Sequence, residues 1–429
     1  MDTGIALMIF IVVYLAIITE KFNRAFLAVV GGLLMVLFGL VDIDDMLVKY
    51  IDWETITLLF SMMVMVSITS HTGLFEYIAV WLAKKVKGSP LLLLVSISAL
   101  TVVGSAFLDN VTMVLLLVPI VLTLTEILAV KPVPYLTAII LFSNIGGTAT
   151  LIGDPPNIMI GQVVDHLEFN DFLKHLSPVV LVVSCLVLML LTFYYRHSLT
   201  VTEENRNKIL ALEAGAYLQR GTMLVKSVSV LSLTIIGFLF HPFLHIELTT
   251  VAMAGALLLV LLTYKQHGPE KVFRSVEWMT LFFFAGLFML VGGLKESGVI
   301  DEVARSIIYH TKGDLPTTAL FILWGSGLFS GFVDNIPFVA AMIPIIQEFQ
   351  DYGMTNIDPL WWSLSLGACF GGNGTLIGAS ANVIVAGSAA KKGCPLGFIQ
   401  FMKIGIPVVL LSLVISSVYL YIRYFIYFE

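Results

Sequence analysis

Long apolar runs separated by short polar loops recur along this 429-residue chain and restrict the folds open to it. A helix needs roughly 20 consecutive apolar residues to cross the hydrocarbon core of a bilayer. Only 12% of the residues are charged and 58% are hydrophobic, whereas about a quarter of the residues in a soluble domain are charged. The sequence therefore predicts an all-α membrane protein.

Ten of the apolar runs are expected to be transmembrane helices. They lie at residues 4–19, 24–41, 56–72, 134–165, 178–195, 224–240, 247–264, 279–294, 360–390 and 405–427. Two further stretches, 91–129 and 317–349, are each interrupted at the centre by Asp-Asn. We expect each of these to be a re-entrant hairpin that enters the membrane and returns on the same side.

The loop charges orient these spans. Lys and Arg gather in alternate loops. The positive-inside rule places Lys- and Arg-rich loops in the cytoplasm. All of these loops lie there if neither hairpin crosses the membrane and both termini lie outside. The mixed-charge loop at 295–316 fits this arrangement least well. The N-terminus lacks the basic region and cleavage site of a signal peptide, so the first run is expected to be retained. The sequence thus predicts a multi-pass protein of the cell (inner or plasma) membrane, surrounded by lipid.

Charge and cysteine content exclude some other classes. The net charge of −6 and the absence of a basic tract give no indication of nucleic acid binding. Cys185, Cys369 and Cys394 are far apart and form no CxxC pair. They are expected to be small buried hydrophobic residues, although their spacing neither requires nor excludes a thiol site for a metalloid.

An internal repeat with a constant offset of 225 residues relates the two halves. Residues 105–110 match 330–335, residues 146–153 match 371–378, and Trp53 matches Trp278. These matches continue without a gap over more than 100 residues. Each half is expected to contain five crossings and one hairpin, and an odd number of crossings inverts the second half. Inverted repeats with discontinuous helices are typical of secondary transporters.

The repeat defines the expected domain organisation. Residues 1–196 form the first inverted repeat, with the hairpin 91–129 and a broken helix at 134–165. Residues 197–222 form a cytoplasmic linker. Residues 223–429 form the second repeat, with the hairpin 317–349 and a broken helix at 360–390.

The hairpin centres carry Asp109 and Asp334 at equivalent positions. A carboxylate at bilayer depth costs roughly 2.5–3.5 kcal/mol on insertion scales, so its recurrence in both repeats indicates a function. Each Asp could instead cap the second half-helix of its hairpin. The two roles are compatible, because a half-helix that begins at the midplane is itself a ligand site.

Glycine-rich breaks interrupt the two spans at 134–165 and 360–390. Both breaks read Gly-Gly-x-x-Thr-Leu-Ile-Gly, and Pro155 and Pro156 follow the first. Backbone carbonyls freed by such a break can coordinate a cation. The alternative is a packing joint kinked by the prolines, but the second break has none.

A polar, mostly uncharged set of residues surrounds the tips and breaks. The candidate substrate- and ion-binding residues are Ser105, Asp109, Asn110, Asn144, Gly147, Thr148, Thr150, Asp154, Asn157, Ser330, Asp334, Asn335, Gly372, Asn373, Thr375 and Asn382. Their oxygens suit Na⁺ or a neutral polyhydroxyl solute. No Lys or Arg lies within the tips or breaks, which argues against a site built from fixed cations for carboxylate substrates.

Asp154 breaks the symmetry, because its repeat partner is Ala379. Burial favours the neutral form of a carboxyl group, so Asp154 is a candidate for carrying a proton. The alternative is that it caps the helix that begins at Pro155.

At these motifs the chain resembles a known superfamily. Residues 107–112, 143–157, 333–337 and 371–382 are similar to the ion transporter superfamily. The branch they resemble has a citrate-transporter-like domain and includes arsenite permeases, a class of Na⁺/H⁺ antiporters and the melanosomal P protein. The resemblance implies a homodimer in which a mobile part moves against a scaffold as an elevator.

The resemblance also implies Na⁺ sites at the tips and breaks. One would involve Ser105, Asn110, Gly147 and Thr150, and the other Ser330, Asn335, Gly372 and Thr375. The dicarboxylate branch has Ser-Asn-Thr at its tips, whereas this chain has Asp-Asn-Val and Asp-Asn-Ile. The resemblance therefore indicates the transport mechanism more specifically than it indicates the transported solute.

We expect a secondary active transporter that exports arsenite, antimonite or another small inorganic ion, coupled to H⁺ or Na⁺ and without a cofactor. A Na⁺/H⁺ antiporter is the main alternative. A dicarboxylate or anion carrier and a passive channel are less favoured, and the sequence leaves open an ATPase subunit as partner. An intramembrane aspartyl protease using Asp109 and Asp334 would lack the Gly-x-Gly-Asp context of such enzymes, so we expect no enzyme.

Overall fold

All regular secondary structure in the described residues is helical. The computed structural model describes residues 2–19, 21–219, 221–266 and 268–426. Up to residue 217 the elements are α1 (Asp2–Ile18), α2 (Arg24–Leu37), α3 (Ile43–Asp45), the π-helix η1 (Met46–Tyr50), α4 (Trp53–Ser70), α5 (Leu74–Lys85), α6 (Pro90–Phe107), α7 (Asn110–Leu128), α8 (Val133–Gly147), α9 (Pro155–Val163), α10 (Phe169–Tyr195), α11 (Glu203–Ala211) and the 3₁₀-helix η2 (Ala214–Tyr217).

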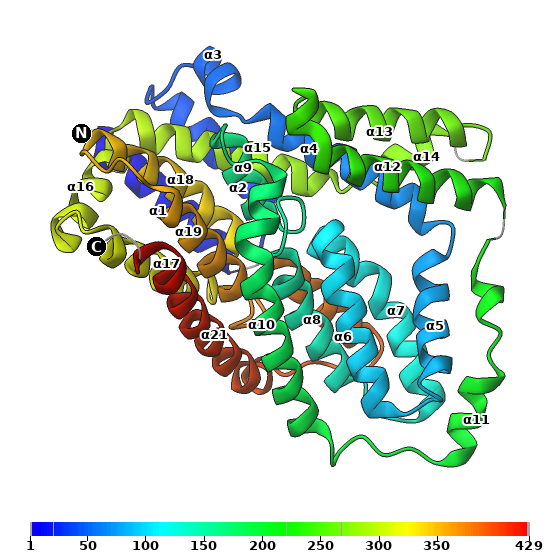
Figure 1. Cartoon of the computed structure of the whole chain (residues 1–429). Helices are drawn as coiled ribbons and strands as arrows, with labels where there is room; N and C mark the ends of the chain where they lie inside the picture. The colour runs from blue at the N-terminus through cyan, green and yellow to red at the C-terminus, as the bar shows by residue number, and fades with distance from the viewer. Residues whose placement is uncertain (1, 20, 220, 267, 427–429) are drawn as a thin grey trace.

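The remaining elements complete the chain shown in Figure 1. They are α12 (Thr222–Leu244), α13 (Leu248–Thr263), α14 (Pro269–Arg274), α15 (Trp278–Glu296), α16 (Val299–Thr311), α17 (Leu315–Ser330), α18 (Asn335–Asp351), α19 (Asp358–Gly371), α20 (Ser380–Lys391), α21 (Phe398–Leu420) and the π-helix η3 (Tyr421–Phe425).

Seven helices among the described residues are long and apolar enough to cross a bilayer. They are α4, α6, α7, α10, α12, α15 and α21 with its π-helical end. Shorter apolar helices, including α1, α2, α8, α13 and α17, accompany them. The predicted all-α membrane class is confirmed. The count of ten crossings and the return of both hairpins to one face stay predictions.

The helix boundaries follow the 225-residue offset. Helices α4 to α9 begin at residues 53, 74, 90, 110, 133 and 155, and α15 to α20 begin at 278, 299, 315, 335, 358 and 380. Two of these helices, α5 and α16, lie in segments that we expected to be loops. They are short and mix polar with apolar residues, so a search for long apolar runs misses them.

Helices from the two halves of the chain pack against each other. α2 lies along α15, and its repeat counterpart α13 lies along α4. A Cβ added to Gly286 of α15 would lie 2.4 Å from the backbone of Val29 on α2. Small residues allow such close helix contacts in membranes. Figure 1 shows α4, α12 and α13 side by side, apart from the bundle that contains α6, α7 and α8.

Equivalent glycines hold the broken helices against the hairpins. A Cβ on Gly146 of α8 would lie 2.4 Å from the carbonyl oxygen of Val102 on α6, and one on Gly371 of α19 would lie 2.4 Å from that of Gly327 on α17. The backbones in the middle of the molecule are thus in direct contact.

We expect Gly146→Ala to destabilise the protein by about 1–3 kcal/mol, because the methyl group must push α6 and α8 apart. Thermal unfolding in detergent would show this as a lower apparent Tm. Gly387→Ala is the matched control, since its Cβ meets no atom within 4 Å and alanine favours the helix. An equal Tm for the two variants would contradict the prediction.

Candidate functional site

Both hairpins break at the predicted Asp-Asn positions. α6 ends at Phe107 and α7 begins at Asn110, while α17 ends at Ser330 and α18 begins at Asn335. The Asp109 carboxylate accepts a hydrogen bond from the backbone N–H of Thr112 at 2.8 Å. The Asp334 carboxylate accepts one from Ile336 at 3.2 Å. Both aspartates therefore cap the second helix of their hairpin, as the capping interpretation requires.

Both glycine-rich breaks interrupt their helices as expected. α8 ends at Gly147 before α9 begins at Pro155, and α19 ends at Gly371 before α20 begins at Ser380. In the first break, the Asn157 amide donates to the carbonyl oxygens of Thr148 and Thr150 at 3.2 and 2.8 Å. In the second break, Asn382 donates to those of Gly372 and Thr375 at 2.7 and 2.9 Å. In each half, an asparagine amide therefore forms hydrogen bonds with carbonyl oxygens that the break frees.

Asp154 lies between the two hairpin tips and is fully buried. Its Oδ1 accepts a hydrogen bond from Asn110 Nδ2 at 3.2 Å. Both of its oxygens accept from Asn335 Nδ2, at 3.4 and 3.3 Å. It makes no capping hydrogen bond to α9. The interpretation of Asp154 as a helix cap is therefore wrong, because its carboxylate joins one tip to the other instead.

An amide network connects the two breaks. Asn144 Nδ2 donates to Asn373 Oδ1 and Asn382 Oδ1, both at 3.0 Å. Asn110 Nδ2 also reaches Asn144 Oδ1 at 3.2 Å, and Asn373 Nδ2 donates to the carbonyl oxygen of Leu141 at 3.3 Å. These asparagines are all buried. The polar residues singled out in the two halves therefore form one continuous centre.

The residues expected to bind Na⁺ lie around carbonyl oxygens. A Cβ on Gly153 would lie 2.5 Å from the carbonyl oxygen of Gly147 and 2.7 Å from that of Ser105. At the equivalent Gly378, the distances to Gly372 and Ser330 are 2.7 and 2.9 Å.

The serine and threonine hydroxyl groups of the two predicted Na⁺ sites form hydrogen bonds with the backbone. Ser105 donates to Ser143 at 2.6 Å and Ser330 donates to Ala368 at 2.7 Å. Thr150 donates to the carbonyl oxygen of Ala106, and Thr148 donates to that of Asn144 at 2.8 Å. Thr375 accepts a hydrogen bond from the backbone N–H of Ile377 at 3.2 Å. Ser105, Gly147 and Thr150 therefore converge, whereas Asn110 and Asn335 turn their amides toward Asp154. Their role in Na⁺ binding stays a prediction.

A small chamber of about 20 Å³ lies where the tips meet α4 and α15. A cavity of this size holds about one water molecule. Its charged lining residues are Arg24, Asp109, Asp154 and Glu277. The chamber thus carries three carboxyl groups beside one guanidinium group, which favours a cation or a proton over an anion.

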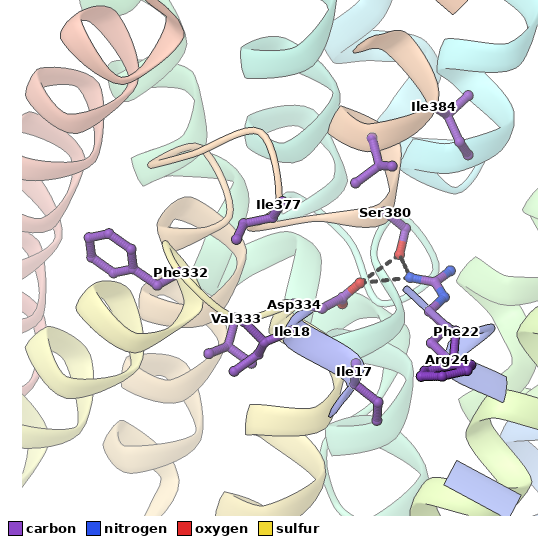
Figure 2. A pocket seen from close by; sticks show the side chains of 11 residues that line it. Ile17, Ile18, Phe22, Arg24, Phe332, Val333, Asp334, Ile377, Ser380 and Ile384 are labelled. Carbon is purple, nitrogen blue, oxygen red and sulfur yellow. Dashed lines mark hydrogen bonds and ion pairs between the residues drawn. The ribbon is translucent and has the colours of Figure 1, made fainter. Parts of the chain in front are cut away.

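The Arg24 guanidinium is already engaged by the second hairpin. Its Nη1 lies 2.8 Å from Asp334 Oδ2 and also donates to Ser380 Oγ, which in turn donates to Asp334 at 2.7 Å. Figure 2 shows these three side chains converging in the lining of a larger pocket. This pocket has a volume of about 300 Å³, and many of its other lining residues are aliphatic. No Lys or Arg lies within the tips in the sequence, but Arg24 reaches the second tip from the start of α2.

Sequence reasoning missed Arg24 and Glu277 as chamber residues. Arg24 lies at the start of the second predicted span, and it is 310 residues from its partner Asp334. A signal for Glu277 does exist: it precedes Trp278 as Asp52 precedes Trp53, at the same 225-residue offset.

The cysteines and histidines build no metal centre in the part of the chain that the structure describes. No group of three or more His, Cys, Asp or Glu side chains there could hold a metal ion. Cys369 is buried, with its Sγ 3.9 Å from Asn157 Oδ1, whereas Cys185 is exposed. The thiols therefore offer no three-sulfur site for a metalloid.

Comparison with known proteins places this architecture in a family. Residues 14–367 match the family described as citrate transporter, CitMHS. This chain belongs to the CitMHS family. It is therefore a member of the ion transporter superfamily that the motifs resemble. An uncharacterized transporter of Mycobacterium tuberculosis is 41% identical over 430 residues, which cover 99% of each chain. The 46 kDa membrane protein of Mycobacterium leprae is 40% identical over 98% of each chain.

Two more distant similarities also cover most of this chain. The P protein of Homo sapiens is 32% identical over 494 residues, which cover 96% of this chain and 59% of the P protein. The crystal structure of the Alcanivorax borkumensis YdaH transporter is similar with a TM-score of 0.61 and 13% identity, over 93% of this chain and 98% of that one. At this identity the likeness concerns the fold alone. This CitMHS member is thus a multi-pass membrane transporter.

Proposed function

We propose that this protein is a secondary active transporter that exchanges a small inorganic cation, with Na⁺ as the first candidate, for protons at Asp154. The observation that carries this proposal is the position of Asp154, buried between the two hairpin tips in a chamber with room for about one water molecule. A buried carboxylate binds either one proton or one monovalent cation, and both cannot occupy it together. Competition between the proton and the cation for this carboxylate couples the proton flux to the cation flux.

The surroundings of Asp154 suit both its ionised state without a cation and its state with a bound cation. Asn110 and Asn335 donate to its oxygens when it is ionised. When a cation enters, the carbonyl oxygens near Gly147 and Gly372 supply hard oxygen ligands. The proposal includes the two Na⁺ sites expected there.

The movement that we propose is an elevator. The tips and broken helices would travel together across the membrane against α2, α4, α13 and α15, within a homodimer with both termini outside and ten crossings. Arg24 of α2 contacts the tip at Asp334, so this contact would have to break during the movement.

Export of arsenite or antimonite is the second candidate. The continuous amide network around Asn144 supports it, because amide groups can both donate to and accept from the hydroxyl groups of a neutral trihydroxide. A site made of thiols receives no support from the cysteines.

Flux in proteoliposomes separates these candidates. A pH-sensitive dye trapped with an imposed proton gradient should respond to added Na⁺, and K⁺, arsenite and citrate should be compared in the same vesicles. We expect a Na⁺-dependent pH change that protein-free vesicles lack. Arsenite accumulation without a Na⁺ response would favour the second candidate. No gradient-dependent flux of either solute would overturn the proposal.

A further inference from the structure

Two cavities lie toward opposite ends of α4 and α15, and we name each after its acidic residue. The Glu277 vestibule, of about 160 Å³, is lined by Ser67, Ser70, Ser275 and Glu277 among others. The Asp52 vestibule, of about 540 Å³, is lined by Tyr50, Asp52, Gly292 and Lys295 among others.

The two vestibules are built from equivalent positions of the repeat. Glu277 corresponds to Asp52, Ser275 to Tyr50, Ser67 to Gly292 and Ser70 to Lys295, each at an offset of 225. Equivalent residues of an inverted repeat face opposite sides of the membrane. The vestibules are therefore counterparts of one another.

The positions along α4 and α15 agree with this assignment. The Asp52 vestibule contains the start of α4 and the last turns of α15, whereas the Glu277 vestibule contains the last turns of α4 and the residues just before α15. Each helix has 18 or 19 residues and is thus about 27 Å long, close to the thickness of about 30 Å of the hydrocarbon core. Cavities at opposite ends of this pair open to opposite faces.

In this conformation the Glu277 vestibule meets the chamber. Met63 and Glu277 line both cavities, while no described residue that lines the Asp52 vestibule also lines the chamber. The carboxylates of Asp52 and Glu277 also differ in their hydrogen bonds. Asp52 caps α4 by accepting from Glu54 and Thr55, both at 3.0 Å. Glu277 makes no such cap on α15 and accepts from Thr280 Oγ1 at 3.1 Å.

We propose that Glu277 is the cation-attracting residue through which a small monovalent cation or a proton passes from the Glu277 vestibule to Asp154. The Asp52 vestibule is the counterpart entrance at the opposite face, closed from the chamber in this conformation. This inference rests on the proposed role of Asp154 as the ion-binding carboxylate. A carboxylate at the mouth of a cleft raises the local cation concentration.

Thiol labelling tests the positions of the vestibules without any transport measurement. Ser70→Cys and Lys295→Cys are made singly in a protein with Cys185→Ser and Cys394→Ser, while buried Cys369 is kept. A membrane-impermeant maleimide is applied to intact cells and to inverted vesicles. We expect the two cysteines to be labelled from opposite faces. Labelling of both from the same face would overturn the assignment.

The role of Glu277 is tested by reagent charge. At Ser70→Cys we compare the modification rates of a cationic and an anionic methanethiosulfonate. Glu277→Gln should lower the ratio of cationic to anionic rates by roughly three- to tenfold, because one negative charge near the thiol is removed. Asp52→Asn is the matched control, because asparagine also caps a helix well and the residue belongs to the other vestibule. An unchanged ratio in Glu277→Gln would contradict the role of Glu277.

Flux measurements then separate this inference from the proposed function. In proteoliposomes, Glu277→Gln should slow ²²Na⁺ uptake several-fold, whereas equilibrium ²²Na⁺ binding to the solubilised protein should change less than about twofold. If Asp154→Asn leaves uptake intact, the proposed function fails. If Asp154→Asn abolishes uptake while Glu277→Gln has the wild-type rate, the proposed function stands and this inference fails.

Discussion

Replacing Asp154 by asparagine should reduce transport at least on the order of 100-fold. The substitution keeps the shape of the side chain but removes the group that binds a proton or a cation. In the wild-type protein, Asn110 and Asn335 donate to the Asp154 carboxylate. The substitution places an amide there instead. Hydrogen bonds to a charged group are worth about 1.5–3 kcal/mol each, and every 1.4 kcal/mol corresponds to about a tenfold change in rate.

Initial rates of ion-driven pH change in proteoliposomes measure this effect. Asp314→Asn is the control, because Asp314 caps α17 at an exposed position and asparagine caps equally well. Asp109→Asn should lie between the two, since its cap survives while one chamber charge is lost. The gel-filtration profile of each variant verifies that it is folded. Wild-type flux in a folded Asp154→Asn protein would remove Asp154 from the mechanism.

Removing the Arg24 guanidinium should impair transport at least about tenfold, and a second change at Asp334 should restore part of the loss. The pair at 2.8 Å joins α2 to the tip of the second hairpin. Arg24→Gln leaves the Asp334 carboxylate without its cation in a mostly buried place, which is costly. Arg24→Gln with Asp334→Asn removes both charges and relieves that cost.

A double-mutant cycle quantifies this contact. We expect a coupling of about 1–3 kcal/mol between Arg24 and Asp334 from thermal unfolding and flux of the four proteins. Lys49 and Glu296, 2.9 Å apart with more exposed side chains, form the control pair. Hydrogen bonds to Glu296 and Tyr50 raise the pKa of Lys49, so the pair is ionised at neutral pH, yet exposed pairs contribute only about 0–1 kcal/mol. Additive effects at Arg24 and Asp334 would show that the two residues act separately.

The sequence predicted the tips and the breaks because their signals are local. Asp-Asn within an apolar run and the run Gly-Gly-x-x-Thr-Leu-Ile-Gly within a span both indicate an interrupted membrane helix. Their recurrence at a fixed offset shows that they are not accidents of composition. The structure accordingly ends α6 at Phe107 and α8 at Gly147.

Other features were not accessible from local patterns. α5 and α16 are amphipathic and too short to resemble a span. The choice between a cap and an ion-binding role for Asp154 also required the structure, because both use an acidic residue before a proline. No backbone N–H group of α9 donates a hydrogen bond to the Asp154 carboxylate, which decided against the side-chain cap.

The sequence by itself thus determined the membrane environment, the repeat offset and the places where helices break, since each depends on residue type within a few turns of chain. The tertiary structure alone decided which charges meet in the chamber. Arg24 and Glu277 come from helices far from the tips in sequence, and their approach depends on how α2 and α15 pack against the hairpins. No local spacing rule encodes such contacts, because they arise from the packing of whole helices.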